Sequence, residues 1–382
     1  MRVSNISLDR SPGATTRIRL RADVEYDRGG TEEYWYDVPE ADADALNRTG
    51  DPWLAALLPL AATLGENLSI PIAVDPVLKA NAVQLLRIWK SWYPKLSVIE
   101  IEAEPDTPLR ENPPNRVGAF FSSGVDSFFT LLRDREAAAP MERCGINDLI
   151  TVFGFDIKLA RPDAFARLAD RHAAIADQLG KGYIDVATNI RETRWKETAW
   201  SELSHGAALA SIGVALGNRY SAIYIPGSGG HRRLRPWGSH SVTDPLFSTR
   251  TTTIINDAVA YLRTDKLEMI AESQLALDNL RVCWESWSDT NCGECAKCLR
   301  TMLALDLFGV IDRCQTLPHH PDLLDRIAKM DCSYFVTYGE LEDLRRIAKA
   351  RGRQDMWHAI DTSMRRTKRR ERIKSLLRLN RS

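Results

Sequence analysis

The earliest clear pattern in the chain is an alternation of apolar and polar residues that predicts a β-hairpin. Apolar residues take every second position in residues 18–26 and again in residues 34–38, with Gly29 and Gly30 between the two runs. A period of two places the apolar side chains of a strand on one face, and a glycine pair permits a tight turn. We therefore expect two antiparallel strands here.

The following segments extend this region and then interrupt it. Apolar residues recur at helical spacing in residues 78–92, and residues 98–104 have strand character. Residues 105–115 contain four prolines, which disfavour helix and remove hydrogen-bond donors. We predict an N-terminal α+β domain over residues 1–104 and a Pro-rich linker over residues 105–115.

After the linker, apolar strand-like runs alternate with helical patterns. Strand and helix patterns that alternate predict crossover units, and hence a parallel sheet with helices on both faces. The fold class expected is therefore α/β over residues 116–280. A helical region that contains a four-cysteine motif and ends in a basic tail is expected over residues 281–382. The predicted strands are residues 116–121, 149–155, 183–188 and 221–227, and the predicted helices are residues 127–136, 163–180 and 205–217.

Composition adds little to this picture but limits the class of protein. The 382 residues are 44% hydrophobic and 27% charged, which is the balance of an ordinary globular protein. No apolar run approaches the ~20 residues that a membrane span needs, and residues 1–10 have no apolar signal-peptide core. We expect a cytoplasmic protein without a membrane partner.

Charge is balanced overall but concentrated at the C-terminus. Lys and Arg number 51, as do Asp and Glu, yet residues 365–382 contain nine Lys and Arg residues and a single acid, Glu371. Ile373, Leu376 and Leu377 form a thin apolar stripe in this tail. The tail predicts contact with RNA, DNA or an acidic partner, and the alternative is a solvated helix.

A short turn, Ser-Ser-Gly-Val-Asp-Ser, connects the first predicted strand of the α/β region to its first helix. At such a position backbone N–H groups and the helix dipole favour an anion. The serines add hydroxyl donors and Gly124 permits close approach. Asp126 has a role there if it holds Mg²⁺, and the alternative is a plain helix cap.

This turn resembles the PP-loop of ATP pyrophosphatases, whose pattern is Ser-Gly-Gly-x-Asp-Ser. The resemblance implies that ATP, with Mg²⁺, binds the loop, and that Asp126 and Ser127 serve the reaction. It also implies that Gly154 and Asp156, at the end of the second strand, border the nucleotide. Ser123 stands where the family has Gly and is strained if the turn needs a positive φ. The expected ATP-binding residues are Ser122, Ser123, Gly124, Val125, Asp126, Ser127, Gly154 and Asp156.

Four cysteines lie close together in the C-terminal region. Cys283, Cys292, Cys295 and Cys298 have the spacing C-x8-C-x2-C-x2-C. Four thiolates satisfy a tetrahedral Zn²⁺ and mark a closed, structural site. Lys297 and Arg300 would offset its negative charge. An iron–sulfur cluster is the alternative, because it also takes four thiolates.

The PP-loop followed by this cysteine spacing resembles the 7-cyano-7-deazaguanine synthase family over residues 116–307. The chain lacks that family's Tyr-Pro-Asp-Cys segment and has a long loop, residues 226–249, which indicates a different substrate. Arg235 and Asp244 in this loop are the expected catalytic residues that face the acceptor. His205 is either a general base or a helix cap.

The resemblance implies an ATP-dependent ligase. A carboxylate or amide oxygen would be adenylated, and a nitrogen nucleophile would then displace AMP. The expected acceptor is a small molecule or a protein terminus, and a homodimer is compatible with the sequence. Two alternatives remain open: a PP-loop enzyme that modifies tRNA bases, and a non-catalytic nucleotide-binding protein of a defence system.

Overall fold

The computed structural model describes residues 1–13, 16–104, 114–136, 144–228 and 230–379. The chain forms two compact units, which we call the sheet unit and the helical unit. The sheet unit comprises Met1–Ser122 and Thr130–Ala260, and the helical unit comprises Ser123–Phe129 and Tyr261–Ser382. The predicted linker lies almost wholly outside the described residues.

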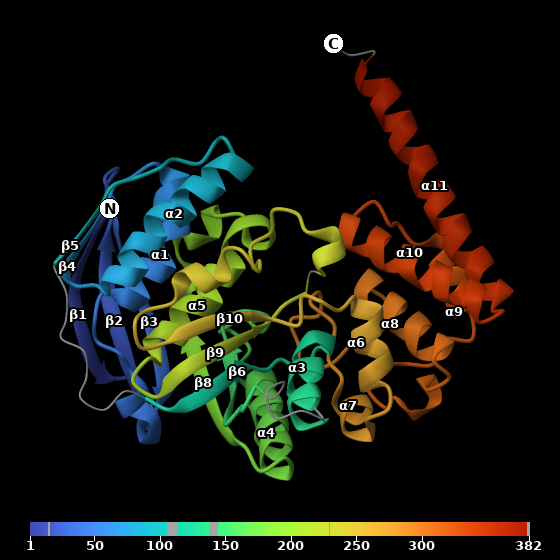
Figure 1. Cartoon of the computed structure of the whole chain (residues 1–382), viewed down its shortest axis with the longest axis horizontal. Helices are drawn as coiled ribbons and strands as arrows, with labels where there is room; N and C mark the ends of the chain where they lie inside the picture. Colours follow the sequence, from blue (N-terminus) through green and yellow to red (C-terminus); the bar gives the residue numbers. More distant parts are fainter. Residues whose placement is uncertain (14–15, 105–113, 137–143, 229, 380–382) are drawn as a thin grey trace. The chain divides into compact units, whose positions relative to one another are not determined.

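The sheet unit is built on ten strands in one sheet, in the order β10-β9-β6-β7-β8-β3-β2-β1-β4-β5 (Figure 1). Five strands, β10, β9, β6, β7 and β8, run parallel to one another, as expected for the α/β region. The strands are β1 (Arg2–Arg10), β2 (Arg17–Glu25), β3 (Thr31–Pro39), β4 (Leu68–Ala73), β5 (Ile101–Glu104), β6 (Arg116–Phe120), β7 (Asp148–Phe153), β8 (Gly182–Thr188), β9 (Tyr220–Pro226) and β10 (Thr253–Asp257).

The N-terminal strands belong to this same sheet. β2 and β3 form the predicted hairpin, and Gly29 and Gly30 have φ of 87° and 96° in its turn. β3 then pairs antiparallel with β8 through Tyr36–Thr188 and Asp37–Ala187. Residues 1–104 therefore share a mixed, mostly parallel sheet with the α/β region. β1, β4 and β10 were not expected from the sequence.

Helices cover both faces of the sheet. α1 packs against α2 and α5 on one face, and α4 packs on β7 and β8 on the other (Figure 1). The core between α1 and the hairpin is aromatic, with the Tyr36 and Trp53 rings 5.5 Å apart. The Tyr36 hydroxyl donates to Ser211 Oγ of α5 at 2.9 Å. These helices are α1 (Asp51–Leu64), α2 (Pro76–Trp92), α3 (Val125–Glu136), α4 (Pro162–Gln178) and α5 (His205–Ala215).

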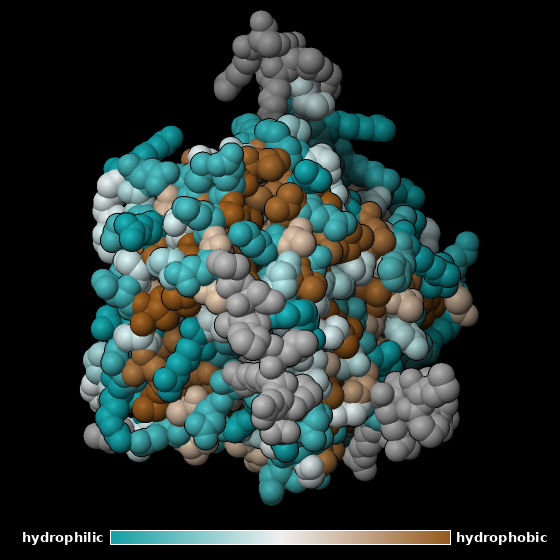
Figure 2. Space-filling model, turned by 60° about the vertical axis from the view of Figure 1, so that its left-hand side comes forward, coloured by the Kyte–Doolittle hydropathy of each residue, from teal (hydrophilic) through white to brown (hydrophobic). Residues whose placement is uncertain are grey.

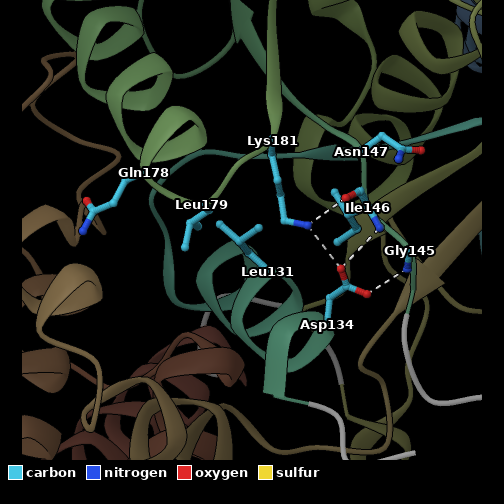
Figure 3. A pocket seen from close by; sticks show the side chains of 8 residues that line it. All are labelled: Leu131, Asp134, Gly145, Ile146, Asn147, Gln178, Leu179 and Lys181. Carbon is cyan, nitrogen blue, oxygen red and sulfur yellow. Dashed lines mark hydrogen bonds and ion pairs between the residues drawn. The ribbon is translucent and has the colours of Figure 1, made fainter. Parts of the chain in front are cut away.

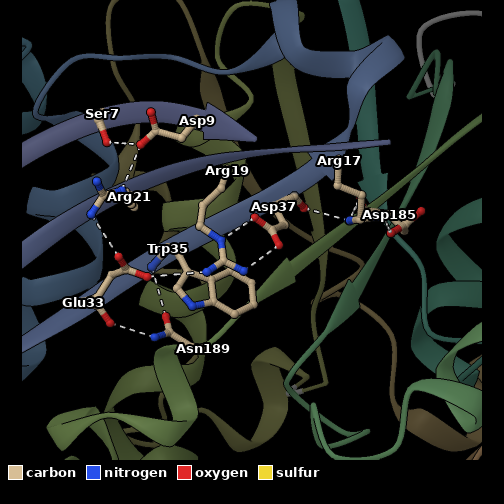
Figure 4. A network of polar contacts seen from close by, with 10 residues as sticks. All are labelled: Ser7, Asp9, Arg17, Arg19, Arg21, Glu33, Trp35, Asp37, Asp185 and Asn189. Atoms are coloured by element: carbon tan, nitrogen blue, oxygen red, sulfur yellow. Dashed lines mark hydrogen bonds and ion pairs between the residues drawn. The ribbon is translucent and has the colours of Figure 1, made fainter. Parts of the chain in front are cut away.

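The opposite face of the hairpin carries charged side chains in a ladder (Figure 4). Arg19 forms a two-pronged ion pair with Asp37, at 2.9 and 3.0 Å, and its guanidinium lies 4.0 Å from the centre of the Trp35 ring. Arg17 binds Asp185 of β8 at 2.7 Å. Such cross-strand pairs stabilise one register of β2, β3 and β8.

The described part of the helical unit contains six further α-helices, from α6 to α11. They are α6 (Arg263–Ile270), α7 (Gln274–Asn279), α8 (Ala296–Leu307), α9 (Leu323–Lys329), α10 (Phe335–Ala350) and α11 (Gln354–Leu379). Among the described residues, no helix combines the length and the apolar character that a bilayer crossing requires. On the face drawn in Figure 2, hydrophobic residues form separate groups between hydrophilic ones.

Candidate functional site

The serine-rich turn has the strained backbone that its sequence suggested. Ser123 has a φ of 58°, in the left-handed region where a Cβ atom costs about 1–2 kcal/mol. Its carbonyl accepts a hydrogen bond from the Arg281 N–H at 2.9 Å, which holds the turn in place. The Ser127 hydroxyl donates to the Gly124 carbonyl at 3.1 Å, at the start of α3. These two hydrogen bonds therefore fix the backbone of the turn at the start of α3.

Asp126, in the first turn of α3, is bound by two cations of α6. Arg263 Nη1 lies 2.7 Å from one carboxylate oxygen and Lys266 Nζ lies 3.0 Å from the other. Lys266 is fully buried and Arg263 is 9% exposed. Burial by itself would raise the pKa of Asp126, but the charges of Lys266 and Arg263 outweigh it and hold the pKa below its ordinary value.

The same cations belong to a larger buried network within the helical unit. Arg263 Nε also pairs with Glu340 of α10 at 3.2 Å, and Glu340 in turn contacts Arg300 of α8. Arg300 Nη1 donates to the Thr337 hydroxyl at 2.6 Å. The network thus connects the first turn of α3 with the helix that begins in the cysteine motif.

This network includes the three cations Arg263, Lys266 and Arg300 and the carboxylates of Asp126 and Glu340. Arg263 Nη2 is buried and makes no hydrogen bond to any described residue. A buried guanidinium donor without an acceptor is costly, so the cluster suits an anion at the N-terminus of α3.

The prediction that Asp126 holds Mg²⁺ does not fit these contacts. Both of its oxygens already face cations, and Glu340 lies between two arginines. A divalent cation would have to displace a positive group from either carboxylate. The donor set therefore disfavours Mg²⁺ held by Asp126.

Gly154 is required by the protein's own backbone. Its φ is 100°, and a Cβ atom there would lie 2.0 Å from the Thr188 carbonyl oxygen. The residue was expected to border the nucleotide, but the space beside it is taken by the end of β8. Asp156 and Arg235, also predicted at this edge of the sheet, are exposed.

Asp244 is fully buried and does not face a surface at which an acceptor could bind. Its carboxylate accepts from Ser239 Oγ at 2.6 Å, Asn256 Nδ2 at 2.7 Å and the His240 N–H at 3.1 Å. Burial raises its pKa to about 6. Asp244 therefore anchors the loop after β9 to β10, a position that its sequence context did not reveal.

His205 opens α5, as the sequence suggested. Its Nδ1 lies 3.0 Å from the Trp200 carbonyl, and its ring is 6.0 Å from that of Trp237. Burial lowers its pKa to about 4, so the imidazole is neutral at physiological pH. The side chain is placed against the preceding π-helical turn, Trp200–Ser204.

The four cysteines form a cluster that could hold a metal ion such as zinc. Their sulfurs all lie within 4.8 Å of one another, with Sγ separations of 3.9, 3.9 and 3.5 Å for the pairs 283–295, 292–298 and 295–298. A tetrahedron with Zn–S bonds of about 2.3 Å has sulfurs about 3.8 Å apart. A hydrogen bond from the Cys298 thiol lowers the pKa of Cys295 to about 5, which favours a thiolate.

Two residues between the cysteines, Gly293 and Asn291, shape this cluster. A Cβ atom at Gly293, whose φ is 76°, would lie 2.4 Å from a Pro318 ring carbon. The Asn291 side chain accepts from the Val282 and Cys283 N–H groups at 2.8 and 3.1 Å. It also donates to two backbone carbonyls. Asn291 therefore holds Cys283 beside the other three ligands.

A cavity of about 530 Å³ lies elsewhere, where β7 and β8 begin (Figure 3). Asp134 and Lys181 face each other there at 3.4 Å, and Lys181 Nζ also donates to the Ile146 carbonyl at 2.7 Å. Asp134 accepts from the Gly145 N–H at 2.8 Å. The charged groups of this cavity have partners within the sheet unit. Open α/β sheets bind ligands at the other end of their strands, so the cavity is a poor candidate for the site.

The chain was compared with protein-family models, with curated proteins and with solved structures, and none of them matches.

Proposed function

We propose that the first turn of α3 and its two α6 cations bind the phosphates of ATP. The observation that carries this proposal is the buried Arg263 guanidinium, which contacts Asp126 and retains an Nη2 donor with no acceptor among the described residues. A phosphate oxygen supplies such an acceptor, and the helix dipole favours its negative charge. Lys266 adds a second buried cation at the same point.

The reaction that this binding would serve is adenylation. A carboxylate or amide oxygen of the acceptor attacks the α-phosphorus, the bond to the bridging oxygen breaks, and pyrophosphate leaves with that oxygen. A nitrogen nucleophile then attacks the activated carbon, loses a proton, and AMP leaves with the acceptor oxygen. The buried cations stabilise the charge on the leaving pyrophosphate. This assignment follows the PP-loop resemblance of Ser122–Ser127, and the acceptor contacts of Arg235 stay a prediction.

A nucleotide-binding protein without turnover is the second candidate. It is favoured by one observation, namely that Asp126 is neutralised by two cations and not available to a metal. The two candidates share the phosphate contacts and differ in whether AMP forms.

The test is a titration of wild type, Lys266→Met and Lys349→Met with ATP and, separately, with pyrophosphate. Lys349 is an exposed cation in the same unit and serves as the control. A buried charge-assisted hydrogen bond is worth about 1.5–3 kcal/mol, so Lys266→Met should weaken both ligands roughly 10- to 150-fold. Equal affinities in all three proteins would refute phosphate binding at this cluster.

Turnover is tested by AMP release from ATP in the presence of ammonium and a panel of carboxylic acids. AMP formed only when an acid is present supports the ligase. ATP binding without AMP over the whole panel supports the second candidate, and ADP formation would contradict adenylation.

A further inference from the structure

Exposed cations form a stripe along one side of α11. Arg365, Lys368, Arg369 and Arg372 follow the spacing i, i+3, i+4, i+7, which places them on one side of the helix. All four are exposed. We propose that this stripe, which we call the α11 stripe, binds the phosphate backbone of a nucleic acid.

The other side of α11 is fixed to the helical unit. Met356, Ile360 and Met364 are buried on it, and α11 packs on α9 and α10. The Ser363 hydroxyl donates to the Met330 carbonyl at 2.9 Å, and Thr367 Oγ1 accepts from the Cys332 N–H at 3.2 Å. The C-terminal part of the helix continues past α9 and α10 (Figure 1). The α11 stripe therefore faces away from the side of the helix that packs on α9 and α10.

The charges of the stripe are poorly compensated. Arg365 pairs with Asp361 at 2.6 Å, and Lys368 Nζ lies 5.6 Å from the centre of the Tyr338 ring. Within the described part of the chain, Arg369 and Arg372 have no acidic partner within ion-pair distance. Like charges at i, i+3 and i, i+4 destabilise a helix by about 0.2–0.5 kcal/mol per pair. A polyanion bound along the stripe would remove that repulsion.

The residues around the stripe narrow the class of partner. A helix that lies in a membrane surface needs a broad apolar face, and a stable protein interface needs a hydrophobic centre. Among the α11 residues up to Ser375, whose side chains are described, Ile373, 47% exposed, is the only large apolar side chain that is exposed. Three of the four cations are arginines, whose planar fork suits phosphate oxygens. A partner bound chiefly by charge remains, and a nucleic acid carries the highest regular charge density.

The length of the α11 stripe also agrees with the spacing of phosphates along a DNA duplex. The stripe spans eight residues, from Arg365 to Arg372, or about 10 Å of helix axis. A DNA duplex presents one negative charge per ~1.7 Å of its axis, so about six phosphates lie within that length. Four arginine and lysine contacts to phosphates predict a slope of about −3.6 in a plot of log K against log salt. Binding should then weaken about 150-fold between 50 and 200 mM salt.

The experiment measures anisotropy of a fluorescein-labelled 20-base-pair DNA duplex with three full-length proteins. They are the wild type, a variant with all four stripe cations changed to Gln, and a control with Arg28, Arg48, Arg87 and Lys95 changed to Gln. The control changes the same charge on exposed residues of the sheet unit. Gln has a helix propensity close to that of Arg, and circular dichroism checks that α11 is kept.

We expect the stripe variant to lose at least 100-fold in affinity at 50 mM salt together with most of the salt slope, while the control stays within threefold of wild type. Wild-type binding with a slope between −1 and 0, or an equal loss in the control, would overturn the proposal. Tighter binding to polyglutamate than to the duplex would assign the stripe to an acidic protein. Binding to phosphatidylserine vesicles without binding to the duplex would assign it to a membrane.

Discussion

Asp126→Asn should destabilise the helical unit, because the substitution leaves two buried cations without their common anion. The shape of the side chain is almost unchanged, so packing is preserved. Lys266 then keeps its charge in a fully buried position, and Arg263 keeps only Glu340. Loss of one partner of a buried pair costs about 3–5 kcal/mol, and the 17% exposure of the Asp126 side chain favours the lower end of that range.

The assay is chemical denaturation of wild type, Asp126→Asn and Asp312→Asn. Asp312 has a side chain that is 92% exposed and lies in the same unit, so its variant should stay within about 0.5 kcal/mol of wild type. Lys266→Met and the double variant complete a cycle, in which the second change should cost less once the first is made. A free energy of unfolding for Asp126→Asn within 0.5 kcal/mol of wild type would refute the reasoning.

The same variant separates two roles for the carboxylate. If Asp126 neutralises cations, then Asp126→Asn frees positive charge and should bind pyrophosphate more tightly than wild type, with a larger gain in stability on saturation. If Asp126 held Mg²⁺, magnesium pyrophosphate would bind the variant more weakly. The pH dependence follows from the lowered pKa. The stability due to Asp126 is complete above the unfolded-state pKa of about 3.9 and is lost as the pH falls toward the lower folded-state value.

Three further predictions concern the cysteine cluster and the buried loop. The purified protein should hold about one Zn²⁺ per chain, measured by elemental analysis, and Cys295→Ser should lower both the metal content and the stability. A wild type that is folded and free of metal would contradict this. Visible absorbance would indicate an iron–sulfur cluster in place of zinc. Asn291→Ala should weaken zinc retention against a chelator about 10- to 100-fold while leaving the four ligands intact, and retention equal to that of wild type would show that Cys283 needs no support. The raised pKa of Asp244 means that its contribution to stability is greatest below the unfolded-state pKa near 3.9 and is lost as the pH rises through about 6. The difference in unfolding free energy between wild type and Asp244→Asn should therefore shift by roughly 2–3 kcal/mol between pH 4 and pH 7, and a constant difference would contradict the buried carboxylate.

The sequence predictions that were confirmed depended on patterns within short segments of the chain. Alternation in residues 18–26 and 34–38 was enough for the hairpin, and the C-x8-C-x2-C-x2-C spacing was enough for the cysteine cluster. α1 was missed because its residues are almost all apolar and buried, so no amphipathic period appears. The buried role of Asp244 was missed because Asp is usually exposed.

The partners of Asp126 that are distant in the sequence could not be predicted, for a different reason. Arg263 and Lys266 lie 137 and 140 positions after Asp126, and charged residues in a helix are usually solvated. No local signal marks them as buried. Asn291 was similarly hidden, because a backbone-bridging amide looks like any polar residue between two cysteines. In each case the missing information is which distant segment covers the residue.

The antiparallel pairing of β3 with β8 has a consequence for how the protein is made. β3 ends at Pro39, and β8, its antiparallel neighbour, begins only at Gly182. At typical synthesis rates of 5–20 residues per second, the ribosome needs about 7–30 s to produce the intervening chain. Throughout that interval the N-terminal strands have an open edge with unpaired amide groups, a surface on which nascent chains aggregate. Slower translation would prolong that exposure, so the yield of folded protein should depend on elongation speed and on chaperones that cover strand edges.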